Sequence, residues 1–349
     1  LHERMKFVQE AYLLGSKSYK DGKGEAAVVE DIKSINYLAF HVQAPEVFKE
    51  VSPSVKNRGF EEMYKRGREW CLSYFELLYE RLGSDFDYYF FESEAAKRGY
   101  KIVKKALSEG IFKIDAGAVI FDAKEHDESL HTRVFINSKD LPTYEAKDLA
   151  LPIMKKEKYG YDRSVIITGA EQINYFKVVL TALERVSPDL KGKTQHIGHG
   201  FILDSSGKKM SSRSGGSVSG EWLLDEVLER VLEKVDKDID KSVVDKITLG
   251  AVKYAFLKNG IGKDIIFDFD EVTNFDGDSG AYIMYTYARA NSLLARFGSV
   301  SSGTSDYDPN LLTVYEVEIL RALEKFPKVV KQAVVGMTPN VVANYLFDH

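Results

Sequence analysis

The middle of the chain alternates between apolar strands and amphipathic helices, and this pattern constrains the fold more than any other feature of the sequence. Residues 163–168 have the length of a buried strand with the apolar residues 165–167 at its centre, Gly169 turns the chain, and residues 171–186 carry apolar side chains at helical spacing. Such alternation is typical of a parallel sheet that helices cover. We therefore predict an α/β fold from Tyr144 onward.

Smaller patterns predict the elements around this strand and helix. Tyr144 begins a helix that we expect to end or to kink at Pro152, because proline lacks an amide hydrogen. Residues 196–203 predict a second strand, which leads into a basic loop. Ser219 has the residue type and position of a helix N-cap, with Glu221 in the first turn of the helix that follows.

The two ends of the chain are predicted to be mainly helical. The apolar periodicity before residue 111 predicts helices at about 3–20, 26–43, 58–82 and 93–109 and a short strand at 87–91. Beyond residue 240 it predicts helices at 249–257, 282–297, about 310–333 and about 338–348 and a short strand at 264–270.

Between these regions, residues 117–121 and 133–136 predict two strands joined by an acidic turn. The turn contains His126 and His131. We interpret it as a solvated loop, with a metal site as the alternative, because the ligand spacing of known metal motifs is missing.

Composition excludes several classes of protein. The chain has 349 residues, enough for about two domains, with 44% apolar and 29% charged residues and no apolar run long enough to span a bilayer. Its start carries charges and no apolar segment of the kind found in a secretory signal. The single cysteine, Cys71, favours a reducing cytoplasm, and we interpret it as a packed helix residue. A net charge of −5 confines any RNA contact to a local basic patch.

Residues 208–215, with the sequence KKMSSRSG, combine cations, hydroxyls and glycine in one loop. Such a loop can fold over a triphosphate and offer backbone amides, hydroxyls and ammonium groups together. The stretch resembles the KMSKS motif of class I aminoacyl-tRNA synthetases, with Arg213 in place of the second lysine.

Several further blocks follow one another in the order found in one family. They are residues 143–148 (TYEAKD), 169–172 (GAEQ), 268–270 (DFD) and 277–289 (GDSGAYIMYTYAR). Together with the basic loop they resemble arginyl-tRNA synthetases, over most of the chain from about residue 57. Two departures are mild: Tyr175 stands where family members often carry histidine, and Ala281 stands where they carry proline.

Residues 196–199 spell HIGH, which is the other motif of class I synthetases. In that family the motif follows the first strand of the nucleotide fold and opens a helix, far before the KMSKS loop. Here the letters run into the apolar residues 200–203. We therefore interpret them as part of a strand that enters the basic loop, and not as the catalytic motif.

The resemblance implies an arginine pocket. Arginine is a planar cation with five donors, so its pocket must supply fixed acceptors and a carboxylate. Tyr144 and Asp148 are four residues apart and lie on one face of the predicted helix. The resemblance implies that Asp148 pairs with the substrate while Tyr144 and Gln172 orient it. Without the resemblance, Tyr144 and Asp148 would be interpreted as an ordinary helix start with a surface aspartate.

It also implies an ATP site. Gly169 and Glu171 follow a strand end, where nucleotides bind in parallel sheets, and the resemblance places them near the adenylate ribose. For Gly169 a plain turn glycine is the alternative.

The cations expected to meet the leaving pyrophosphate are, in order, Lys209, Lys208 and Arg213. Met210, Ser211 and Ser212 complete the ATP-binding loop, and Mg²⁺ is expected on the phosphates. The implied reaction forms arginyl-adenylate and then transfers arginine to the 3′ end of tRNA(Arg), without a covalent nucleophile from the protein.

For Tyr285, Tyr287 and Arg289 two interpretations stay open. These side chains could stack on or pair with tRNA, or they could pack against neighbouring helices.

The resemblance implies an α/β fold: the second half of the Rossmann-like catalytic fold, an α/β insertion and the start of a C-terminal helical bundle. We expect an internal piece of a synthetase, without the HIGH-bearing half before residue 1 and ending within the anticodon domain. The expected domains are the insertion at 1–140, the half-fold with its KMSKS-like loop at 141–240, and a helical linker with part of the anticodon-binding domain at 241–349.

The predicted function is that of an arginine–tRNA ligase using ATP, with L-arginine and tRNA(Arg) as partners. We expect a cytoplasmic monomer without membrane association, and little adenylate formation by the piece alone. A non-catalytic tRNA-binding module is the alternative. A cysteinyl enzyme is disfavoured, because it would need several zinc-binding cysteines.

Overall fold

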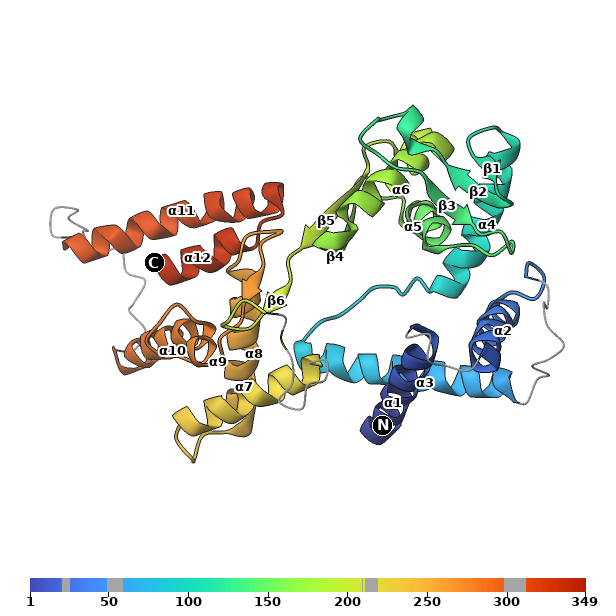
Figure 1. Cartoon of the computed structure of the whole chain (residues 1–349). Helices are drawn as coiled ribbons and strands as arrows, with labels where there is room; N and C mark the ends of the chain where they lie inside the picture. Colours follow the sequence, from blue (N-terminus) through green and yellow to red (C-terminus); the bar gives the residue numbers. More distant parts are fainter. Residues whose placement is uncertain (21–25, 49–58, 209, 211–218, 298–311) are drawn as a thin grey trace. The chain divides into compact units, whose positions relative to one another are not determined.

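The computed structural model describes residues 1–20, 26–48, 59–208, 210, 219–297 and 312–349 (Figure 1). The chain divides into two compact units. The first unit holds residues 1–166 and 174–196, and the second holds residues 167–173 and 197–349.

Three helices open the first unit: α1 (His2–Lys20), α2 (Ala26–Gln43) and α3 (Phe60–Leu82). They confirm the three helices predicted there. The predicted stop of the third is also confirmed. Gly83 follows α3 with φ of 59°, and its amide donates to the carbonyl of Glu80 at 3.0 Å.

The strand predicted at residues 87–91 is wrong. These residues are all described, and they run to the start of α4 (Glu92–Ser108) without strand pairing. Their aromatic side chains favour strands, but here the rings contact one another. Tyr88 and Phe90 lie 4.7 Å apart between ring centroids, as do Tyr79 and Phe86. Contacts between aromatic rings therefore stabilise this segment, and hydrogen bonds to a neighbouring strand do not.

The core of the first unit lies around a three-stranded antiparallel sheet of β1 (Lys113–Asp115), β2 (Ala118–Phe121) and β3 (Arg133–Ile136). The predicted strand pair is confirmed. β1 was not predicted, because its three exposed residues carry no apolar pattern. The turn before β3 contains the short 3₁₀ helix η1 (Ala123–Glu125).

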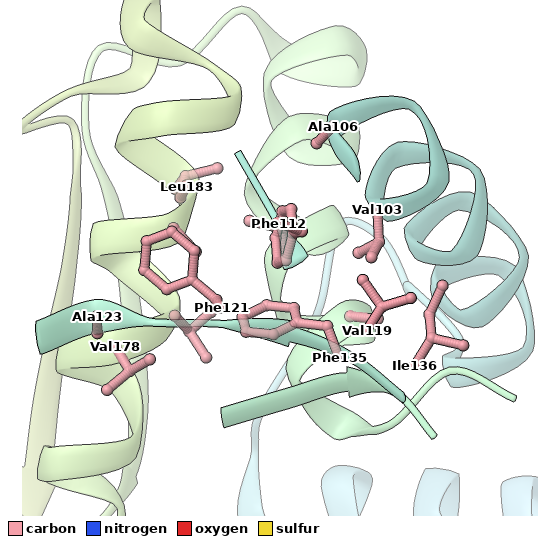
Figure 2. Close-up of a cluster of buried hydrophobic side chains, with 14 of the residues drawn as sticks. Val103, Ala106, Phe112, Val119, Phe121, Ala123, Phe135, Ile136, Val178 and Leu183 are labelled. Atoms are coloured by element: carbon pink, nitrogen blue, oxygen red, sulfur yellow. The ribbon is translucent and has the colours of Figure 1, made fainter. Parts of the chain in front are cut away.

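Figure 2 shows the side chains of this core. Val103 of α4 and Leu183 of α6 (Ile173–Val186) belong to one buried cluster with the rings of Phe121 and Phe135. All four side chains are almost fully buried. The sheet thus shares its core with α4, which precedes it in the chain, and with α6, which follows it.

We predicted that the helix starting at Tyr144 ends or kinks at Pro152; helix α5 (Tyr144–Tyr159) continues through Pro152, so the first of these two outcomes is wrong. The helix ends instead at Gly160, which has φ of 62°. Pro152 is buried, and the packing of its ring outweighs the loss of one backbone hydrogen bond.

The predicted strand at residues 163–168 is confirmed as β4 (Ser164–Gly169), which pairs with β5 (Thr194–His199). The strand predicted at 196–203 is in fact two strands. β6 (Ile202–Leu203) leaves β5 and pairs in parallel with β7 (Ile265–Ile266). The break falls at Gly200, where a Cβ atom would clash with the carbonyl of Lys263.

The helices α7 (Gly220–Lys234), α8 (Lys241–Leu257), α9 (Phe269–Val272), α10 (Gly280–Phe297), α11 (Val314–Gly336) and α12 (Asn340–Asp348) complete the second unit. Ser219 caps α7 as predicted, since its Oγ accepts from the amide of Trp222 at 3.1 Å. The predicted strand 264–270 is shorter than expected, because Asp268 caps α9. Figure 1 shows α11 and α12 side by side. No helix within the described ranges is long and apolar enough to cross a membrane.

Candidate functional site

The site begins with the carboxylate of Asp148, which is half-buried on α5. Its Oδ2 accepts a hydrogen bond of 2.6 Å from the hydroxyl of Tyr175 on α6. Pro152 stands four residues later and has no amide hydrogen to offer to the backbone carbonyl of Asp148. The hydroxyl of Tyr175 therefore fixes the carboxylate of Asp148 at this turn of α5.

Burial raises the pKa of Asp148. The hydroxyl of Tyr175 opposes this rise by donating to the ionised form, and the charge of Lys147 opposes it too. The carboxylates of Glu92 and Glu145 raise the pKa further. Three carboxyl groups therefore share one small region, and a cation placed among them would relieve their repulsion.

Tyr175 remains protonated in this environment. Burial and the negative charge of Asp148 raise the pKa of its phenol, whereas the charge of Arg133 lowers it. The guanidinium of Arg133 lies 4.8 Å from the centroid of the Tyr175 ring. The hydroxyl is therefore a permanent donor to the carboxylate.

Arg133, at the start of β3, is held from two sides. Its Nη1 donates to Oε1 of Glu145 at 3.0 Å, and its Nε donates to Nε2 of His131 at 3.0 Å. The Glu145 side chain is only 13% exposed. The positive charge of Arg133 is thus paired with Glu145 rather than with Asp148.

Tyr144 lies at the first turn of α5, and its side chain is 64% exposed. The ammonium of Lys147 lies 4.6 Å from its ring centroid and donates to Glu92 at 2.9 Å. The spacing of four residues puts Tyr144 and Asp148 on one helix face, as expected.

Gln172 is exposed in η2 (Ala170–Gln172) and belongs to the second unit, whereas Tyr144 and Asp148 belong to the first. A pocket that joins all three therefore stays a prediction. Gly169 and Glu171 follow β4 as expected. The carboxylate of Glu171 folds back over Gly169, at the place that a Cβ atom of residue 169 would occupy.

The predicted phosphate loop lies mostly outside the described residues, which leave out Lys209, Ser211, Ser212 and Arg213. Residues 204–208, which form the stem of the loop, are described. Oδ1 of Asp204 accepts from the hydroxyl of Ser206 at 2.6 Å and from the amide of Lys208 at 3.1 Å, and these bonds lower the pKa of Asp204. The side chain of Lys208 is exposed.

Met210 lines a cavity of about 270 Å³ in the second unit. Trp222, Arg230 and Asp268 share the lining. The guanidinium of Arg230 lies over the ring of Phe269 and pairs with Glu226. The loop stem therefore borders a cavity whose wall combines charged and aromatic side chains of α7 and the start of α9.

The HIGH letters lie on β5, which confirms that they do not open a helix. The ring of His196 stacks on Phe176 with centroids 4.3 Å apart, and burial lowers its pKa. The Nδ1 of His199 lies 2.9 Å from the carbonyl oxygen of Gly200. Gly198 packs so closely on Ile173 that a Cβ atom would not fit.

Tyr285, Tyr287 and Arg289 lie on α10 with exposed side chains. Tyr287 is 71% exposed. The guanidinium of Arg289 lies 5.7 Å from the ring centroid of Tyr285. Tyr282 instead packs against Phe347 of α12. Exposure leaves these groups available to a ligand, and their role in RNA binding stays a prediction.

Sequence reasoning missed the groups that surround Asp148. Glu92, Arg133 and Glu145 come from three different elements, and no motif joined them in the sequence. Tyr175 was noticed only as a departure from the family pattern. One available clue was the position of Glu145, which comes three residues before Asp148 and adds a second carboxylate to the helix face.

Two family matches cover most of the chain. Residues 19–269 match the family described as tRNA synthetases class I (R), catalytic domain, and residues 283–348 match the DALR anticodon binding domain.

Curated relatives include proteins named arginine–tRNA ligase. That of Clostridium acetobutylicum is 28% identical, and the match covers 95% of this chain and 61% of the relative. That of Borrelia hermsii is 27% identical, with coverage of 82% and 51%. The chain therefore spans little more than half the length of these relatives.

Solved structures show the same fold. The arginyl-tRNA synthetase of Thermus thermophilus matches with a TM-score of 0.69 and 24% identity, over 96% of this chain and 63% of the other. The arginyl-tRNA synthetase of Plasmodium falciparum matches with a TM-score of 0.63 and 20% identity, over 90% and 58%. With the catalytic-domain match covering more than half of its residues, the chain belongs to the class I tRNA synthetases of the arginine (R) family.

Proposed function

We propose that this chain carries the arginine pocket of an arginine–tRNA ligase, with Asp148 as the carboxylate that pairs with the substrate guanidinium. The observation that supports this most strongly is the half-buried Asp148 beside Glu92 and Glu145, with one of its oxygens fixed by Tyr175. A carboxylate whose pKa burial has raised gains most from a cationic ligand, because the ligand restores the favourable environment that water would have provided.

In this proposal the substrate side chain lies along the face of α5. Asp148 accepts from the guanidinium, while Tyr144 and Gln172 orient the arginine. The exposed ring of Tyr144 can cover the planar cation. Glu92 adds negative charge at the edge of the proposed pocket, and its ion pair with Lys147 limits the net negative charge of the pocket. An acidic, partly buried pocket of this kind favours a delocalised cation that can pair with two acceptors at once.

ATP would lie against the second unit. We propose that Gly169 and Glu171 contact the nucleotide after β4, and that Lys208, Lys209 and Arg213 meet the leaving pyrophosphate with Met210, Ser211 and Ser212 around them. Mg²⁺ would arrive on the phosphates. The reaction needs positioning and charge stabilisation rather than a protein nucleophile, and the cations of the loop are suited to that task.

The helices beyond residue 240 would serve tRNA. We propose that Tyr285, Tyr287 and Arg289 contact tRNA(Arg) from α10, which the match to an anticodon binding domain supports. We also propose the domain limits 1–140, 141–240 and 241–349, a monomer, and a cytoplasmic location, the last supported by the single cysteine. The alternative is a non-catalytic tRNA-binding module derived from a class I synthetase.

Equilibrium binding separates the two functions. The chain is titrated by calorimetry with L-arginine, L-lysine and L-citrulline, and separately with tRNA(Arg). The proposal predicts that L-arginine binds more tightly than L-lysine and L-citrulline, because lysine lacks the planar guanidinium and citrulline lacks the positive charge. Binding of tRNA without any arginine binding would support the alternative and contradict the proposal.

A further inference from the structure

We propose that Tyr175 is a positioning residue for the substrate cation: its hydroxyl fixes one oxygen of Asp148, so that the other oxygen is presented to the arginine side chain. This inference rests on the proposed function and adds a residue that the arginine pocket implied by the sequence did not include. The bond joins two side chains that are 27 residues apart, on α5 and α6.

The geometry of the bond supports a selective role. The Tyr175 hydroxyl lies 2.6 Å from Oδ2 of Asp148, a distance typical of a charge-assisted hydrogen bond from a hydroxyl to a carboxylate. A carboxylate rotates easily about its last bond unless a donor fixes it. With Oδ2 engaged, Oδ1 keeps a defined direction, and no side chain or amide in the described part of the chain donates to it.

The ring of Tyr175 is itself held in place. The guanidinium of Arg133 lies 4.8 Å from its centroid, and the ring of Phe176 meets it edge-on at 5.0 Å. Arg133 is fixed in turn by Glu145. The chain of contacts from Glu145 through Arg133 to Tyr175 thus orients the hydroxyl without placing a second cation on Asp148.

The charged and polar groups that shift the pKa of Asp148 come from three elements. Glu92 lies at the start of α4, Glu145 and Lys147 lie on α5, and Tyr175 lies on α6. Arg133 of β3 faces Tyr175. Among these groups, the hydroxyl of Tyr175 is a donor in direct contact with the carboxylate, and its loss would leave burial and two neighbouring carboxylates to favour the protonated acid.

The test uses Tyr175→Phe, which keeps the ring and its contact with Arg133 but removes the hydroxyl. The matched control is Tyr100→Phe. The hydroxyl of Tyr100, on α4, donates to Oδ2 of Asp140 at the same distance of 2.6 Å. Both variants are titrated with L-arginine by calorimetry between pH 5 and 8. The Asp148 carboxyl is followed by ¹³C NMR in the ligand-free chain.

We expect Tyr175→Phe to weaken arginine binding roughly tenfold, which is the typical worth of one hydrogen bond to a charged group. The loss should grow as the pH falls, since the carboxyl of Asp148 now takes a proton at higher pH than in the unaltered chain. The NMR titration of Asp148 should move to higher pH in Tyr175→Phe and stay unchanged in Tyr100→Phe.

The two failures can be told apart. Unaltered arginine binding and an unmoved Asp148 titration in Tyr175→Phe would overturn the role of Tyr175 and leave the arginine pocket standing. Absence of arginine binding by the unaltered chain would overturn the proposed function, and with it the substrate role of Tyr175. A moved titration with unchanged arginine affinity would also overturn the inference, because the fixed oxygen would then not matter to the ligand.

Discussion

Gly99 of α4 lies directly against the backbone carbonyl of Ala146 on α5, so closely that a Cβ atom on residue 99 would clash with that carbonyl. Ala146 is fully buried and lies between Tyr144 and Asp148 on α5. The close approach of the two helices therefore sets where the helix that carries the candidate site can lie. A glycine is required here for the absence of a side chain and not for its backbone angles.

We expect Gly99→Ala to lower the free energy of unfolding by about 2–3 kcal/mol, since the added methyl group must push α4 away from α5. The control is Gly67→Ala in the middle of α3, where a Cβ atom would meet no described atom within 4 Å. That change should raise stability by up to about 1 kcal/mol. Urea unfolding followed by circular dichroism measures both, and equal effects would contradict the packing argument.

Asp148→Asn should stabilise the fold at neutral pH. The pKa of Asp148 is raised in the folded chain, so ionisation costs the folded state more than the unfolded state, and stability falls as the pH rises through the folded pKa. Asparagine keeps an acceptor for Tyr175 and removes the buried charge.

The difference in unfolding free energy between Asp148→Asn and the unaltered chain should therefore grow with pH above the ordinary aspartate value of 3.8 and vanish well below it. Thermal unfolding at a series of pH values measures this difference. An unaltered chain that is the more stable of the two at neutral pH would contradict the assignment of a raised pKa.

The N-cap at α7 offers a test of local structure. Ser219→Ala removes the oxygen that accepts from the amide of Trp222 and should cost about 1 kcal/mol of stability. The control is Ser292→Ala within α10, where the hydroxyl bonds back to the carbonyl of Ala288 and contributes little to the helix. Similar losses in the two variants would show that Ser219 does not act as a cap.

The exposed side chains of α10 give a test of RNA contact. Replacement of Tyr287 by alanine should weaken binding of tRNA(Arg) roughly tenfold, because a stacked base contributes about 1–3 kcal/mol. Replacement of Arg289 should also lower the salt dependence of binding.

Tyr12→Ala on α1 is the control, since Tyr12 is 69% exposed and Tyr287 is 71% exposed. Filter binding at two or more salt concentrations compares the three variants. An equal loss in Tyr12→Ala and Tyr287→Ala would point to a nonspecific effect of removing an exposed ring.

Regular apolar spacing was enough to predict most helices of this chain, including α3 and α6, and the N-cap Ser219. Prediction failed where the deciding contacts came from elsewhere in the sequence. Residues 87–91 looked like a strand because aromatic residues favour strands, but their rings pack on one another. Pro152 looked like a helix end, but burial of its ring retains it inside α5.

The candidate site shows the same division. The spacing alone placed Tyr144 and Asp148 on one face of α5, because a helix brings residues four apart onto one face, and only the family resemblance assigned both to an arginine pocket. The contacts of Asp148 with Tyr175, and of Arg133 with Tyr175, depend on how α5, α6 and β3 pack in the fold. No local pattern in the sequence carries that information.

The central claim is that Asp148 recognises the positive charge of arginine. Calorimetry with L-arginine and L-citrulline on the unaltered chain and on Asp148→Asn tests it most directly, with Asp140→Asn as the control because Asp140 also accepts from a tyrosine hydroxyl. We predict that arginine binds more tightly than citrulline to the unaltered chain and to Asp140→Asn, and that Asp148→Asn loses this preference by roughly tenfold or more. A preference for arginine that survives intact in Asp148→Asn would contradict the account.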